Sequence, residues 1–141
     1  MKSKSLAPAA REKAADAEKI TINVGFVDLG QIDLLVAEGF YGNRTDFIRT
    51  AIRSQLASHA DAVKQAVARK TLVLGLQHFS ADDLRAVQAA RQKLRIRVLG
   101  LASIAHDVSP ELALATIESL DVLGALHASP AVKAALSRLQ R

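Results

Sequence analysis

The chain has 141 residues, 50% of them hydrophobic, and a formal net charge of +5 at pH 7. It has no cysteine, which excludes disulfides and thiolate chemistry. No apolar run approaches the roughly 20 residues of a membrane span, so we expect a cytoplasmic protein, and its positive charge favours nucleic acid among acidic partners.

The first 18 residues are rich in Ala, Lys and Ser and show no apolar stripe. We therefore expect residues 1–18 to form a flexible arm. Two interpretations of its basic side chains stay open, a contact with DNA phosphates or a solvated tail. These side chains are Lys2, Lys4, Arg11 and Lys13.

Apolar and polar residues alternate over residues 19–24, which predicts a β-strand because strand side chains alternate between two faces. The apolar face would carry Ile20, Ile22 and Val24, and the polar face Lys19, Thr21 and Asn23. A lone strand leaves half of its backbone groups unpaired. The nearest partner is the same strand of a second copy, giving an antiparallel ribbon that fits the DNA major groove.

Two amphipathic helices are predicted next. Asp28 and Gln31 suggest a capping box for a helix over residues 29–38, which Gly39 would end. Its apolar stripe consists of Leu29, Ile32, Leu35 and Val36.

Asn43 is a good N-cap for the second helix, with Asp46 three residues later. Its apolar positions are Phe47, Ile48, Ala51, Ile52 and Leu56. Arg44 and Thr45 fall in its first turn, where free backbone N–H groups and the helix dipole favour an anion such as a DNA phosphate.

The order of strand, helix, Gly-containing turn and N-R-T-D-F-I-R helix start resembles the ribbon-helix-helix DNA-binding domains of the MetJ/Arc/CopG type. The segment KITINVGFVDLGQIDLLVAEGFY, followed by NRTDFIR, is similar to one bacterial branch of that family. The resemblance covers about 40 of the 141 residues.

The resemblance implies that outward strand residues touch base edges, here Lys19, Thr21 and Asn23. It also implies that the start of the second helix holds phosphate, here Asn43, Arg44 and Thr45. The family often has a long Arg or Lys among its base readers. Two of the three here are short, which suggests that sequence preference rests partly on DNA shape.

These elements predict a ribbon-helix-helix domain over residues 19–57 that is an obligate homodimer. The expected shared core consists of Ile20, Ile22, Val24, Leu35, Phe47 and Ile52. The helical pattern continues after it, so residues 58–70 are expected to form a helical linker.

Residues 71–141 are expected to form a second, small α/β domain of repeated strand–helix units, which completes an α+β architecture. The triplet Val-Leu-Gly recurs at Val73, Val98 and Val122, and serine caps follow at Ser80, Ser109 and Ser129. The pattern predicts strands at about 71–77, 95–101 and 120–126, and helices at about 81–93, 110–117 and 130–139. Alternating strands and helices imply parallel pairing; the alternative is an ordinary α/β domain in which the triplet recurs by chance.

The last unit keeps an apolar strand and an apolar helix stripe with no polar closing segment, and repeat arrays normally need polar terminal caps. We therefore expect self-association into higher-order homo-oligomers through Val122, Leu123, Leu126, Val132, Leu136 and Leu139. The alternative is that the linker helix or the partner subunit covers these residues within a simple dimer.

Residue patterns for chemistry are scarce, so no enzyme, catalytic residue, metal or cofactor is expected. The four histidines, His59, His78, His106 and His127, stand far apart without metal-ligand spacing. One local basic cluster, Arg91, Lys93, Arg95 and Arg97, leaves open a solvated surface or a second nucleic-acid contact.

The sequence thus predicts a dimeric, sequence-specific transcriptional regulator, a repressor, that binds double-stranded DNA. Its C-terminal domain would serve either self-association or the sensing of a regulatory signal. Two alternatives remain: an antitoxin whose C-terminal part binds a toxin, and a structural protein that organises DNA with little sequence preference.

Overall fold

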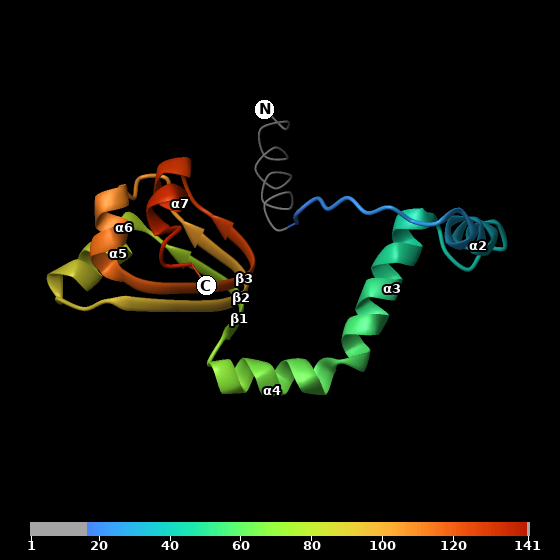
Figure 1. Ribbon diagram of the computed structural model, residues 1–141, viewed down its shortest axis with the longest axis horizontal. Helices are drawn as coiled ribbons and strands as arrows, with labels where there is room; N and C mark the ends of the chain where they lie inside the picture. The colour runs from blue at the N-terminus through green and yellow to red at the C-terminus, as the bar shows by residue number, and fades with distance from the viewer. Residues whose placement is uncertain (1–16, 141) are drawn as a thin grey trace, which may run out of the picture. The chain divides into compact units, whose positions relative to one another are not determined.

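The computed structural model describes residues 17–140 (Figure 1). Their contacts divide them into two compact units, Ala17–Ala66 and a second one that begins at Val67. No helix in this part of the chain is long and apolar enough to cross a membrane.

The N-terminal unit contains α2 (Phe26–Ala37) and α3 (Arg44–Ser58), and α4 (Ala60–Lys70) follows after a break at His59. The predicted apolar stripe of α2 is confirmed, because Leu29, Ile32, Leu35 and Val36 are its buried or half-buried side chains.

The predicted capping box of α2 is wrong. The helix begins at Phe26 with Gly25 as a cap that makes no side-chain hydrogen bond. Asp28 lies instead in the first turn, where an acidic side chain is favourable to the helix dipole. The Gln31 side chain donates to the backbone oxygen of Val27 at 3.4 Å. Asp28 therefore does not cap the helix but lies where the helix dipole favours its negative charge.

The predicted stop at Gly39 is confirmed. Gly39 has a φ of 86°, and its N–H donates to the Val36 oxygen at 3.1 Å while the Phe40 N–H donates to the Leu35 oxygen at 3.0 Å. This is the bonding pattern of a Schellman motif, which favours glycine because the terminating residue needs a positive φ.

Residues 17–25 have no regular secondary structure in the single chain, so the strand expected at 19–24 is not formed there. Ile20 and Ile22 are 73% and 63% exposed. A strand is defined by its ladder of hydrogen bonds to a neighbour, and this segment has none among the described residues. The dimeric ribbon stays a prediction.

The C-terminal unit alternates strands and helices, as predicted. Its elements are β1 (Val73–Phe79), α5 (Ala81–Ala89), β2 (Leu94–Ile104), α6 (Pro110–Thr116), β3 (Ile117–His127) and α7 (Pro130–Leu136). The three strands form one parallel sheet in the order β1-β2-β3.

Several bounds differ from the prediction, and α5 shows why. It ends at Ala89, four residues early, because Arg91 adopts a φ of 55°. The N–H groups of Arg91 and Gln92 then bond back to Gln88 and Val87, which closes the helix. The three predicted serine caps are confirmed, with side chains accepting from the N–H groups of Asp83, Leu112 and Val132.

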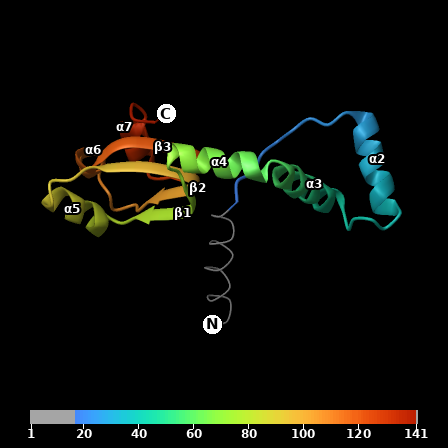
Figure 2. The ribbon, with the colours of Figure 1, turned by 90° about the horizontal axis from the view of Figure 1, so that it is seen from below.

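The Val-Leu-Gly triplets lie side by side in the sheet. Val73 pairs with Val98 and Val98 with Val122, and the same register joins Gly75, Gly100 and Gly124. Each of these glycines has a positive φ, between 121° and 140°. Figures 1 and 2 show β2 and β3 running out, turning and coming back. We call this turn, with its glycine, the corner of the strand, and the parts before and after it the first and second arms.

The core lies inside this bend. In β2 the buried positions are even-numbered on both sides of the corner, namely Ile96, Val98, Ala102 and Ile104, whereas the odd-numbered positions are half-buried or exposed. Side chains from α5, α6 and α7 complete the core. Its members are Ala81, Leu84, Ile96, Val98, Ala102, Ile104, Val108, Ala113, Ile117, Leu120, Val132 and Leu136.

Candidate nucleic-acid interface

The start of α3 is held by two local hydrogen bonds. The Asn43 side-chain oxygen accepts from the Asp46 N–H at 2.7 Å, and the Asp46 carboxylate accepts from the Gly42 N–H at 2.9 Å. The prediction that Asn43 caps the helix is confirmed. These bonds fix the first turn, whose remaining N–H groups face the end where an anion is favoured.

Arg44 connects α3 to α2. Its guanidinium donates to both carboxylate oxygens of Asp33, from Nε at 2.7 Å and from Nη2 at 2.8 Å. Hydrogen bonds from Arg44 lower the pKa of the Asp33 carboxyl, because they stabilise its ionised form. Both side chains are about half exposed, so the guanidinium can still be approached from solvent.

Sequence reasoning missed the role of Asp33. The two residues are 11 positions apart and lie on different helices. Their opposite charges were the only signal, and the helix–helix geometry that brings them together was not visible in the sequence.

The expected base-contacting residues, Lys19, Thr21 and Asn23, are exposed in the extended segment before α2. Within residues 17–140, no hydrogen bond or ion pair joins them to Asn43, Arg44 or Thr45. The single chain therefore does not assemble the two halves of the expected interface.

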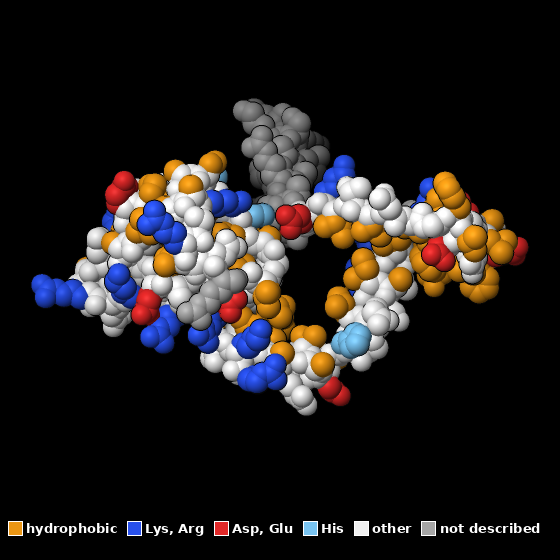
Figure 3. Space-filling model, viewed as in Figure 1, with side chains coloured by type: hydrophobic (Ala, Val, Ile, Leu, Met, Phe, Trp, Pro, Cys, Tyr) orange, Lys and Arg blue, Asp and Glu red, His pale blue; other side chains and the backbone are white. Residues whose placement is uncertain are grey.

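The N-terminal unit also leaves most of its apolar side chains in solvent. Ile32 is its only buried residue among positions 17–66, and α3 has none. Leu35 and Phe47 are half-buried, and Tyr41 packs edge-on against Phe47 at 5.0 Å between ring centroids. Figure 3 shows hydrophobic side chains along α3. The large exposed apolar residues of the N-terminal unit are Ile20, Ile22, Val24, Phe26, Val27, Leu34, Phe40, Ile52, Leu56 and Val63.

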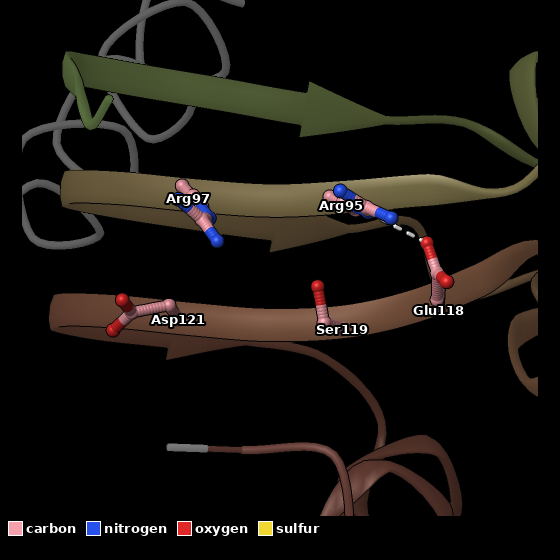
Figure 4. A pocket seen from close by; sticks show the side chains of 5 residues that line it. All are labelled: Arg95, Arg97, Glu118, Ser119 and Asp121. Carbon is pink, nitrogen blue, oxygen red and sulfur yellow. Dashed lines mark hydrogen bonds and ion pairs between the residues drawn. The ribbon is translucent and has the colours of Figure 1, made fainter. Parts of the chain in front are cut away.

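The basic cluster of the C-terminal unit does not form a continuous basic surface. Arg95 and Arg97 line a hollow of about 340 Å³ on the first arms of β2 and β3, beside Glu118, Ser119 and Asp121 (Figure 4). Arg95 Nε donates to Glu118 at 2.7 Å, and this bond lowers the pKa of the Glu118 carboxyl. Arg97 donates to the backbone oxygen of Lys70 at 3.1 Å. Glu118 and Asp121 therefore interrupt the positive charge of this hollow.

Three of the four histidines, His78, His106 and His127, line one hollow of about 420 Å³ in the C-terminal unit. In the part of the chain that the structure describes, no group of three or more His, Cys, Asp or Glu side chains could hold a metal ion.

The expected self-association surface needs correction. Val132 and Leu136 are buried in the core of their own chain, so they cannot contact another copy. Val122, Leu126 and Leu139 are half-buried, and only Leu123 is exposed. The apolar stripe of α7 packs into the core of its own chain. The exposed leucines lie instead beside the corner glycines of the strands.

The comparisons with known proteins add one match. The model of the Ribbon-Helix-Helix transcriptional regulator family matches residues 15–133. No curated protein and no solved structure matches. The matched range extends beyond the segment that carries the resemblance and includes the whole three-stranded sheet.

Proposed function

Because the chain belongs to the ribbon-helix-helix transcriptional regulator family, a DNA-binding role in transcription follows, and we propose that it is a sequence-specific repressor. Two copies pair their segments 19–24 into an antiparallel ribbon, which enters the major groove of an operator. Occupation of the operator then excludes other proteins from that DNA.

The observation that carries this proposal is the exposed alternating segment. Ile20 and Ile22 lie in solvent beside a helix pair that buries only Ile32. Burying a large aliphatic side chain stabilises by about 1.5–3 kcal/mol. Pairing two segments would cover this apolar row and leave Lys19, Thr21 and Asn23 on the outer face.

Phosphate contacts would come from the start of α3. Thr45 lies in its first turn and Arg44 is oriented by Asp33. Phosphate contacts position a protein on DNA, whereas base contacts give sequence preference. The two sets of residues therefore have separable effects.

We further infer that the C-terminal unit self-associates and connects DNA-bound dimers. Leu74 and Leu76, both more than half exposed, support this role. The unit also has a core of its own, whereas a toxin-binding tail of an antitoxin is typically short and poorly folded alone.

Competition titrations between operator and random DNA test the ribbon. Replacing Lys19, Thr21 and Asn23 together by Ala should reduce discrimination, whereas Arg44→Ala should weaken binding to both DNAs similarly. Lys64→Ala, at an exposed lysine on α4, is the control for loss of charge. Unchanged discrimination in the triple variant would contradict the ribbon proposal.

A further inference from the structure

β1 is an edge strand without the usual protection. It has seven residues, Val73–Phe79, and pairs only with β2 among the described residues. Natural edge strands usually carry lysine, proline or another charge, which prevents pairing with a further chain. β1 contains none of these.

Leucine rows cross the sheet at the corners and end in solvent. Leu74, Leu99 and Leu123 form one row. The middle member is half-buried, while Leu74 and Leu123 are 69% and 47% exposed. Neighbours on both sides cover the middle leucine, so a further strand at either edge would cover the outer ones.

The corner glycines also indicate that β1 lacks a neighbouring strand on its outer side. A Cβ built on Gly100 would lie 3.0 Å from the carbonyl carbon of Gly75 and closer still to its oxygen, and Gly124 meets Gly100 in the same way. The corners at Gly100 and Gly124 are therefore each in close contact with the glycine carbonyl of the preceding strand. Gly75 has the same kind of backbone, with a φ of 124°, yet a Cβ there would meet no described atom within 4 Å.

The opposite edge, on β3, is open over a matching length. The Leu120 N–H donates to the Leu139 oxygen at 3.3 Å, and Leu120 forms a bridge with Gln140. These contacts cover the first arm. Residues 122–127, the corner and second arm, have no further strand beside them in the described chain. Through β2, the register aligns residues 122–127 with residues 73–78 of β1.

We propose that copies of this chain join head to tail, with residues 122–127 of β3 in one copy pairing in parallel with β1 of the next. The Gly124 carbonyl then contacts the vacant side of Gly75, and the leucine row continues from Leu123 to Leu74 of the next copy. This inference rests on the proposed self-association and names its surface. Because the two contacting edges differ, the contact repeats from copy to copy and produces a ring or an open chain, depending on the rotation between copies.

The test uses the full chain with Leu74→Lys, Leu123→Glu and the variant that carries both. Sedimentation velocity over about a hundredfold concentration range should show wild-type mass growing beyond the dimer. Each single variant should weaken association at least about tenfold, because a charge replaces one leucine of the row. The double variant should restore association, since the introduced ammonium and carboxylate groups then face each other across the contact between copies. Leu114→Lys is the matched control, because Leu114 is 46% exposed but lies on α6.

Each contrary result has its own meaning. If Leu74→Lys abolishes association while Leu123→Glu has no effect, two β1 edges pair with each other and the head-to-tail inference is wrong. If wild type assembles and neither variant changes it, the edges are not the interface. A wild type that stays dimeric rejects self-association itself, and binding to a single operator, measured in parallel, tests the ribbon independently. Thermal unfolding followed by circular dichroism confirms that every variant is folded.

Discussion

The close approach of the Gly75 carbonyl to the Gly100 corner predicts that Gly100→Ala is severely destabilising. An alanine there must adopt a φ of 140°, and its Cβ must displace the Gly75 carbonyl. The strained backbone alone costs about 1–3 kcal/mol. The obstructing atoms are backbone and cannot rotate away, so relief requires β1 to move off β2. We expect a total loss of at least about 4 kcal/mol, a large part of the roughly 5–15 kcal/mol of a typical domain.

Gly75→Ala is the matched comparison. It introduces the same side chain at a φ of 124°, but no described atom lies within 4 Å. Only the strain of about 1–3 kcal/mol should remain at concentrations too low for edge pairing. Urea unfolding followed by circular dichroism, with hydrogen exchange of the β2 amides, measures both losses. If the two variants differ by less than about 1 kcal/mol, the corner contact does not determine the fold as argued.

Two further predictions concern the N-terminal unit. Asp33→Asn releases Arg44 from its ion pair, so DNA of any sequence should bind more tightly at low salt, with a salt slope steeper by up to about 1 in anisotropy titrations. Affinity and slope that both stay unchanged would show that the ion pair does not limit a contact of Arg44 with phosphate. Ile22→Asp places a charge on the apolar face of the ribbon and should prevent dimerisation, because a buried unpaired carboxylate is strongly unfavourable. Sedimentation in a Leu74→Lys background checks this, with Thr21→Asp on the polar face as the control that should remain dimeric.

Local signals in the sequence predicted most of the secondary structure. Asn43, Ser80, Ser109 and Ser129 cap helices as expected, because an N-cap depends on residues within one turn. The parallel pairing followed from the alternation of strands and helices. Asp28 was wrongly predicted to be a helix cap, because acidic residues are favourable both at a cap and in the first turn.

What the sequence did not show depends on contacts between distant residues. The pair Asp33–Arg44 requires α2 to lie against α3. The burial of individual apolar residues depends on the bend, since Leu123 and Val132 are equally apolar but only Val132 lies inside it. The glycine of each triplet was visible, but its positive φ, which marks the turn of the strand, was not.

The two proposed contacts differ in symmetry, and this difference determines what they build together. Ribbon pairing is isologous and closes after two chains, whereas the β1 to β3 contact is heterologous and repeats from copy to copy. Each DNA-bound dimer would then present two β1 edges and two β3 edges. DNA that carries neighbouring operators raises the effective concentration of these edges, so the edge contact that assembles the free protein connects dimers on DNA at a lower protein concentration. Cooperative filling of adjacent sites that is lost in Leu74→Lys, while single-site affinity is unchanged, is the outcome that this combination of symmetries requires.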